Sequence, residues 1–179
     1  MVIKATRIRT SSGAGPLLRH LADGDDNEAV AVVAGTMADI RDCVEEARRF
    51  GRTYCIRHFI IAPGEDITAE QFGRAADMLA EEFGFERAAV LIVEHVKGRA
   101  AADASRRHWH VVVPEVDGAG RVLSSKHDRL RHEKLSRLLE IAFGHRITPG
   151  AHDLAVIAAL RSEGRMEQAD RLAAALGQG

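Results

Sequence analysis

Apolar and polar residues follow two kinds of spacing along the chain, and each kind predicts an element of secondary structure. Residues 2–8 alternate with the period of two that is typical of a half-buried strand. Short runs rich in β-branched and aromatic residues predict further strands at 28–34, 54–62, 88–96 and 108–116, and an edge strand at 121–123. Helical spacing predicts a short helix from Pro16, longer helices at 38–50, at 69–83 after the N-cap Thr68 and at 128–143, and a C-terminal helical pair from Asp153 that is interrupted at Gly164.

The order of these elements predicts an α+β fold. Strands and helices alternate through most of the chain, but no helix separates the strand at 88–96 from the strand at 108–116. Because a connection without a helix favours antiparallel neighbours, we expect these two strands to pair antiparallel. An antiparallel or mixed sheet with helices on one face is the natural architecture for this pattern.

Composition places the chain among globular proteins of one domain. Its 179 residues are 46% apolar and 28% charged, which allows a sizeable core. No apolar run is long enough to span a bilayer, and the first residues lack the apolar core of a signal peptide. Two cysteines, Cys43 and Cys55, suggest neither a disulfide framework nor a cysteine-rich metal site. We therefore expect a cytoplasmic protein with no membrane partner.

Net charge decides little about nucleic-acid binding. The formal net charge is −1 and the isoelectric point is near 6.8, whereas proteins that coat nucleic acid without specificity usually carry a basic excess. Local basic patches remain compatible with this balance. Aromatic residues make up 4% of the chain, so extensive base stacking is not expected.

The segment with the most distinctive chemistry is Arg-Arg-His-Trp-His-Val-Val-Val at 106–113. Side chains alternate between the faces of a strand, so His108 and His110 point the same way while Trp109 points into the core. His95 lies near the end of the preceding strand and would approach them if the two strands pair antiparallel. Three neutral imidazoles with open positions suit Mn, Zn, Co or Ni, and suit Mg when a phosphate completes the shell.

Other histidines have plainer interpretations. An isolated His-x-His pair often binds no metal, so the interpretation of a metal site depends on the strand context and on His95. Glu94 should face away from His95, and it is left out of the ligand set. We expect His58 to be a core or edge residue of its strand rather than a fourth ligand, and the more C-terminal histidines to be solvated: His127, His132, His145 and His152.

Basic residues flank the predicted metal strand. Arg106 and Arg107 precede it, and a basic run follows in and before the helix at 128–143: Lys126, Arg129, Arg131, Lys134 and Arg137. A charge run of this kind is usually a solvated helix face. Its position after the metal strands leaves contacts with phosphate groups open as the alternative, and the candidates for these are Arg106, Arg107, Lys126 and Arg129.

Four stretches together resemble the MobA/VirD2-like relaxases, which are the mobilisation nucleases of the HUH endonuclease superfamily. They are GAGPLLRHLA at 13–22, DDNEAV at 25–30, VLIVEH at 90–95 followed by HWHVVV at 108–113, and VDGAGRVLSSKHD at 116–128. The resemblance implies a five-stranded antiparallel sheet flanked by helices, with the metal triad at its centre. It also implies a nuclease domain at 1–145 and a C-terminal helical extension of that domain at 146–179.

What this resemblance implies about activity is specific. Such proteins use a divalent metal, with Mn or Mg preferred here to Zn, Co or Ni, to nick single-stranded DNA at an origin of transfer. They remain linked to the 5′ phosphate through a side chain and later rejoin the strand. The implied partners are the origin DNA and, in conjugative mobilisation, accessory mobilisation proteins and a secretion system. One departure is the loop between His95 and His108, which is longer than usual and is interpreted as a mobile insertion.

A second departure concerns the nucleophile, because most relatives carry a tyrosine in the N-terminal helix region and this chain has none there. Tyr54 is the only tyrosine, and it begins a predicted inner strand, where aromatic residues are commonly structural. His20 occupies the position where the family places its nucleophile, and some mobilisation relaxases carry histidine there. A neutral imidazole can attack phosphorus, so we expect His20 to be the nucleophile. Its orienting carboxylate would be Glu28 or one of Asp23, Asp25 and Asp26.

Two alternatives to a relaxase remain open. A degenerate relaxase-like domain would keep DNA or partner binding without nicking. A metallohydrolase with three histidine ligands would cut the phosphodiester with water and leave no covalent adduct. Trapping an adduct distinguishes the relaxase from both.

Overall fold

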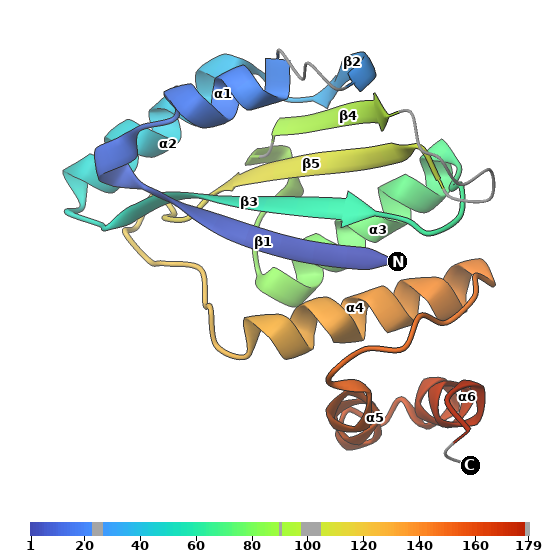
Figure 1. The fold of residues 1–179 in the computed structure, drawn as a ribbon. Coiled ribbons are helices and arrows are strands. Elements are labelled where there is room, and N and C mark those ends of the chain that lie inside the picture. Colours follow the sequence, from blue (N-terminus) through green and yellow to red (C-terminus); the bar gives the residue numbers. More distant parts are fainter. Residues whose placement is uncertain (23–26, 90, 98–104, 178–179) are drawn as a thin grey trace.

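A five-stranded antiparallel sheet forms the centre of the molecule, in the strand order β1-β3-β5-β4-β2 (Figure 1). The computed structural model describes residues 1–22, 27–89, 91–97 and 105–177. The strands are β1 Val2–Arg9, β2 Asn27–Ala34, β3 Tyr54–Ala62, β4 Leu91–Lys97 and β5 Arg107–Pro114. Every neighbouring pair is antiparallel, including β4 with β5. The expected fold class and the expected pairing of these two strands are confirmed.

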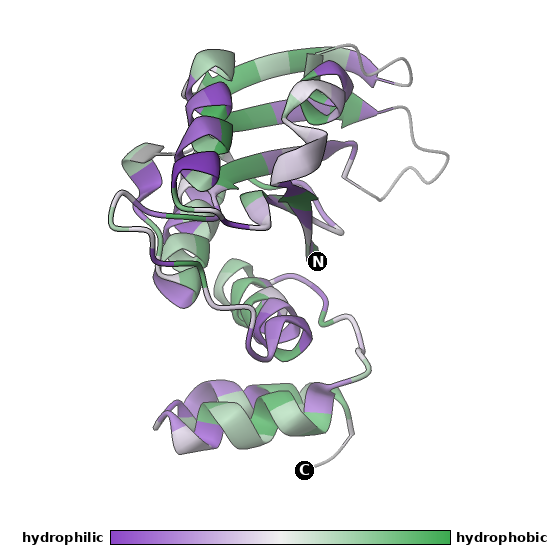
Figure 2. Ribbon diagram, turned by 90° about the vertical axis from the view of Figure 1, so that its left-hand side faces the viewer, coloured by the Kyte–Doolittle hydropathy of each residue, from purple (hydrophilic) through white to green (hydrophobic). Residues whose placement is uncertain are grey.

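Helices cover both faces of the sheet, so the expectation of helices on one face is wrong (Figure 1). Helices α1 (Gly15–Ala22) and α2 (Met37–Arg49) pack on one face, and α3 (Ala69–Phe83) and α4 (Asp128–Phe143) pack on the other. The reason is visible in β5, where Val112 joins the core under α1 and α2 while Trp109 and Val111 join the core above α3 and α4. Figure 2 shows how hydrophobic the central strands are. A sheet that is apolar on both faces needs a layer of helices on each.

Local sequence signals set the ends of several elements. Helices α2 and α3 each begin with a capping box, made by Thr36 with Asp39 and by Thr68 with Gln71, and α3 ends at Gly84 in the left-handed conformation. The strand expected at 88–96 begins later, at Leu91, because Arg87–Ala89 forms a 3₁₀ turn. The strand expected at 108–116 ends at Pro114, and the expected edge strand is reduced to one bridge between Val116 and Val122.

The last two helices form a separate layer against α4. They are α5 (Asp153–Ser162) and α6 (Met166–Ala175), and they lie on the side of α4 that faces away from the sheet (Figure 1). Leu138 of α4 packs with Leu160 and Leu172 in an apolar cluster of their own. The expected C-terminal helical pair is therefore present. None of the described helices has the length and apolar character needed to cross a membrane.

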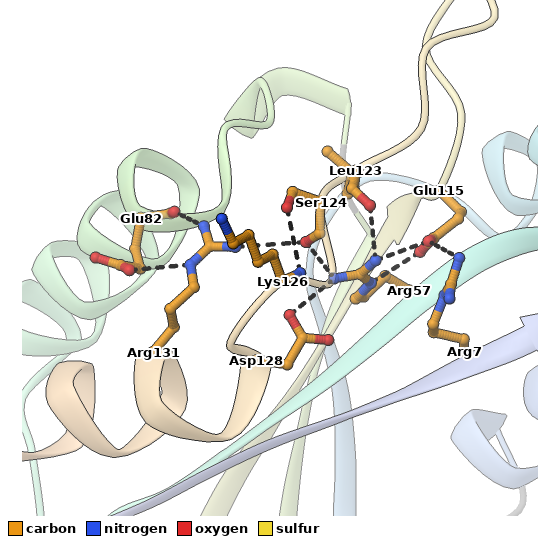
Figure 3. A network of polar contacts seen from close by, with 9 residues as sticks. All are labelled: Arg7, Arg57, Glu82, Glu115, Leu123, Ser124, Lys126, Asp128 and Arg131. Carbon is orange, nitrogen blue, oxygen red and sulfur yellow. Dashed lines mark hydrogen bonds and ion pairs between the residues drawn. The ribbon is translucent and has the colours of Figure 1, made fainter. Parts of the chain in front are cut away.

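A buried charge network fixes the segment between β5 and α4 (Figure 3). Arg57, fully buried in β3, donates to both carboxylate oxygens of Glu115, from Nε at 2.8 Å and from Nη2 at 2.7 Å. The same guanidinium donates to the carbonyls of Leu123 and Ser124 and lies 3.5 Å from Asp128. Because a buried guanidinium must satisfy its five N–H groups, it holds the first turn of α4 against the sheet.

Candidate metal centre

Antiparallel pairing brings three histidines together on one face of the sheet. His95 in β4 is the direct partner of His108 in β5, and His110 lies two residues further along the same strand. One possible ligand atom from each imidazole lies within 4.8 Å of the other two, and all three side chains are buried. The structure thus gathers the triad that the sequence predicts, in an arrangement that can hold a metal ion.

Two of the three imidazoles, those of His95 and His110, favour the neutral form that can bind a divalent metal. Burial lowers the pKa of His110 to about 2, and the neighbouring histidines, His58 first among them, lower it further. Burial also lowers the pKa of His95. Metal binding requires an unprotonated nitrogen, so the lowered pKa values of these two histidines favour it. The buried Nε2 of His110 has no hydrogen-bond partner among the described residues, which is the position that a metal would satisfy.

His95 is held by two further groups. Its Nε2 lies 3.1 Å from the carbonyl oxygen of Leu21, which can only accept, so Nε2 carries the proton. Its Nδ1 lies 3.0 Å from Nδ2 of Asn27, the first residue of β2, and accepts from that amide. A metal bound at Nδ1 would displace the Asn27 amide. Sequence reasoning missed Asn27, because only the pairing of β2 with β4 shows that it lies near the triad.

His58 also contacts the triad without being part of it. It is buried, as expected for a core residue, and its Nε2 lies 2.8 Å from Nδ1 of His110. Burial lowers the pKa of His58 to about 4, so the residue is neutral at pH 7. The expectation that it is not a fourth ligand agrees with the cluster of possible ligand atoms, which contains three histidines and not His58.

Helix α1 places His20 beside the triad. Leu17 and Leu21 are buried and attach the helix to the sheet, whereas His20 is exposed. The centre of the His20 ring lies 5.4 Å from that of His110 and 6.2 Å from that of His95. Of its expected orienting carboxylates, Glu28 forms an ion pair with Arg106. Asp23, Asp25 and Asp26 lie outside the described residues.

Tyr54 lies away from the triad. It is the first residue of β3 and is four strand positions from His58, a distance of about 13 Å along the strand. The guanidinium of Arg7 covers its half-buried ring, with Cζ 4.0 Å from the ring centre. This contact is what a structural aromatic residue at the end of a strand would make.

Arg106, just before β5, and Arg107, the first residue of β5, have different surroundings. Both are exposed. Arg106 pairs with Glu28, and its Nε donates to the carbonyl of Lys97. Arg107 lies 3.6 Å from Glu94; since side chains alternate along β4, Glu94 points to the sheet face opposite His95, as expected. The predicted insertion between His95 and His108 falls mostly on residues 98–104, which lie outside the described part of the chain.

The basic residues in and before α4 fall into two groups, of which one is exposed and the other forms ion pairs inside the protein. Lys126 and Arg129 are exposed at the start of α4, which packs on the face opposite the triad. The other three cations are mostly buried, so this part of the run is not a solvated helix face. They form ion pairs inside the protein: Arg131 with Glu82, Lys134 with Glu82 and Glu163, and Arg137 with Glu140.

Sequence reasoning also missed Lys4. This residue of β1 is exposed, and its positive charge contributes to the lowered pKa of His58, after the effects of burial, His20 and His95. Lys4 pairs with Ile60 of β3, which in turn pairs with His110. The alternation at residues 2–8 showed that Lys4 is exposed, but not that its strand lies two positions from the triad strand.

Comparison with known proteins gives one match. The family model described as relaxase, MobA/VirD2-like, nuclease domain matches residues 25–145, which is more than half of the chain. The match includes all three histidines of the triad and begins after α1, so His20 lies outside it. No curated protein and no solved structure matches the chain. The match, with a sheet and a histidine triad of the kind that the family resemblance implied, shows that this chain belongs to the MobA/VirD2-like relaxase nuclease family.

Proposed function

We propose that the protein is a metal-dependent relaxase that nicks single-stranded DNA at an origin of transfer through His20 and rejoins it during conjugative mobilisation. One observation carries the choice of nucleophile. His20 is exposed on α1 with its ring centre 5.4 Å from that of His110. Tyr54 is instead the first residue of β3, at the end of that strand away from the triad. An exposed nucleophile next to a buried triad lets the scissile phosphate contact both at once.

The triad of His95, His108 and His110 would hold the metal, for which we propose Mn or Mg, with Zn, Co and Ni as alternatives. When bound, a divalent metal polarises the scissile phosphate and stabilises the charge that develops on its oxygens. The chain's own residues contribute the nucleophile and its position. The backbone carbonyl of Leu21, next to His20 in α1, accepts the hydrogen bond of His95, so the helix that carries the nucleophile is tied directly to a ligand.

In the nicking step the unprotonated ring nitrogen of His20 attacks phosphorus. A P–N bond forms, and the bond from phosphorus to the 3′ oxygen breaks, with its electron pair leaving on that oxygen. The imidazole then loses its other ring proton, and the 3′ oxygen gains one, so charge is conserved. Rejoining is the reverse transfer, in which a 3′ hydroxyl attacks the phosphorus and releases His20.

Cations around the triad supply the proposed phosphate contacts. Arg106 precedes the triad strand, and Lys4 lies on the β1 side of it; both are exposed. We keep Arg107, Lys126 and Arg129 as proposed contacts. Lys126 and Arg129 stand at the start of α4, so contact with them requires the strand to continue past the sheet to the other layer of helices.

The cellular setting follows from the proposed reaction. The DNA substrate would be met in the cytoplasm, and the partners would be accessory mobilisation proteins and a conjugative secretion system. We also propose that residues 146–179 extend the nuclease domain of residues 1–145, since α5 and α6 pack on α4 and Lys134 pairs with Glu163 across that contact.

The test is to trap the covalent adduct. Wild type, His20→Ala and Tyr54→Phe would be incubated with Mn²⁺ and labelled single-stranded oligonucleotides that cover candidate origin sequences. Products would be separated under denaturing, non-acidic conditions, because acid hydrolyses a phosphohistidine bond. We expect a protein-linked DNA band from wild type and Tyr54→Phe, and none from His20→Ala.

Each other outcome selects a different account. An adduct that persists in His20→Ala and disappears in Tyr54→Phe would make Tyr54 the nucleophile. Cleavage by wild type without any adduct would favour the hydrolase. Binding without cleavage would favour the degenerate domain, an alternative that rests on the absence of a tyrosine from α1.

A further inference from the structure

A buried histidine outside the triad, His58, packs against His110 of the triad. His58 and His110 are 6% and 2% exposed, and their rings are stacked with centres 5.0 Å apart and planes 22° apart. Nε2 of His58 lies 2.8 Å from Nδ1 of His110, which is a hydrogen-bond distance. The contact joins two neighbouring strands: His110 pairs with Ile60, and His58 is two residues before Ile60 on β3. The sheet itself therefore fixes the distance between the two rings.

One proton lies between the two nitrogens, and its position determines what His110 can do. If His58 donates, Nδ1 of His110 is the acceptor, and a neutral His110 must carry its proton on Nε2. That nitrogen is buried and has no hydrogen-bond partner among the described residues, and a protonated nitrogen cannot bind a metal. If His110 donates from Nδ1, its Nε2 keeps the lone pair. Only this second arrangement is compatible with a ligand at His110.

We propose that His58 is a positioning residue of the metal centre, which accepts the Nδ1–H of His110 and thereby presents the Nε2 lone pair of His110 to the metal. The inference rests on the proposed metal site and adds a residue to it. Metal-bound histidines generally donate a hydrogen bond from the N–H of their second ring nitrogen to a carboxylate, a backbone carbonyl or water. This contact fixes both the tautomer and the orientation of the ring. In this chain an imidazole takes that place, because His58 is the polar group that β3 brings to Nδ1.

Three variants separate positioning from packing. His58→Phe keeps an aromatic ring of similar size but removes the acceptor, whereas His58→Gln supplies an amide oxygen close to the place of Nε2. His132→Phe is the matched control. The expectation that His132 is solvated is wrong: it is also a buried histidine, stacked on Phe83 in the layer of α3 and α4 on the opposite face of the sheet. Each protein would be titrated with Mn²⁺ by calorimetry. Long-range ¹H–¹⁵N NMR would report the His110 tautomer in the metal-free proteins.

We expect wild-type His110 to carry its proton on Nδ1 before any metal is added. His58→Phe should lose this fixed tautomer and bind Mn²⁺ about 10- to 100-fold more weakly, the usual effect of removing such a partner. His58→Gln should recover most of the affinity, and His132→Phe should match wild type.

A metal-free wild type with the proton on Nε2 of His110 would overturn the proposal, as would a His58→Phe variant that binds Mn²⁺ as tightly as wild type. If His58→Phe does not fold, the wild-type tautomer and the His58→Gln titration still decide. A wild type that binds neither Mn²⁺ nor any of Mg²⁺, Zn²⁺, Co²⁺ and Ni²⁺ in the same titration would refute the proposed metal centre, and the positioning role would fall with it. Normal binding by wild type together with an unaffected His58→Phe would refute the positioning role alone.

Discussion

Replacing Glu115 by Gln removes the counterion of the buried Arg57 while keeping the volume of the side chain. In the folded protein, Glu115 is fully buried and accepts from Nε and Nη2 of Arg57. It also pairs with Arg7 at 2.7 Å, but the Arg7 side chain is 31% exposed and can turn to solvent. The substitution therefore leaves one guanidinium, that of Arg57, charged and fully buried next to a neutral amide (Figure 3).

The expected loss of stability follows from what remains around Arg57. Breaking a buried ion pair by removing one partner costs about 3–5 kcal/mol, since the remaining charge is left uncompensated. Asp128 stays 3.5 Å away with a side chain that is 25% exposed, and the carbonyls of Leu123 and Ser124 still accept from Arg57. These contacts place the expected cost at the lower end, about 3 kcal/mol. For a domain of this size, that corresponds to a fall in Tm of about 6–12 °C.

The assay is urea unfolding followed by far-UV circular dichroism and by the fluorescence of Trp109. Trp109 is the only tryptophan, is 3% exposed and stacks on Phe72 with ring centres 4.6 Å apart, so its emission reports the core. Glu45→Gln is the matched control, because Glu45 forms an exposed pair with Arg48 and should change stability by less than about 1 kcal/mol. A Glu115→Gln variant within 1 kcal/mol of wild type would refute the reasoning that the buried charge needs this partner.

Two further predictions concern pH and salt. Burial lowers the pKa of His132 below its ordinary value of 6.5, so the unfolded chain takes up a proton that the folded protein does not. The contribution of neutral His132 to stability should be fully present above pH 6.5 and should be lost as the pH drops toward the lowered pKa. Urea midpoints between pH 7.5 and 5 should therefore fall less steeply with pH in His132→Phe than in wild type. An equal slope in the two proteins would contradict this. The charged groups that act on His132 are Asp128, Arg57, Arg131 and Glu82. Arg106→Ala should weaken single-stranded DNA binding and make the negative slope of log K against log salt less steep by about 0.7. The control Arg161→Ala, at an exposed residue of α5, should leave the slope unchanged. Equal slopes for Arg106→Ala and wild type would remove Arg106 from the interface.

Much of the candidate site could be predicted because its signals are local. The alternation around Trp109 places His108 and His110 on one face, and the absence of a helix before that strand places His95 beside them. The side chain of Thr68 and the left-handed backbone at Gly84 similarly determine the ends of α3, since a cap depends on neighbours within one turn. In such cases the residues that interact are close in sequence or in directly consecutive strands.

Helices on both faces were predictable in principle and were missed. The apolar runs at 91–93 and 111–113 are continuous rather than alternating, which is typical of strands buried on both faces. Such short runs do not show which helix covers which face, because the covering residues lie far away in sequence.

The chain's own sequence thus determined its element types, its helix caps and the triad, because these depend on local periodicity. Only the tertiary structure decided that β3 lies between β1 and β5, which brings His58 to Nδ1 of His110. It alone showed that three cations of α4, those of Arg131, Lys134 and Arg137, form ion pairs inside the protein. Charge and polarity can be read along a chain, but the partner of each charge is fixed by the order of strands and the packing of helices, which are long-range properties.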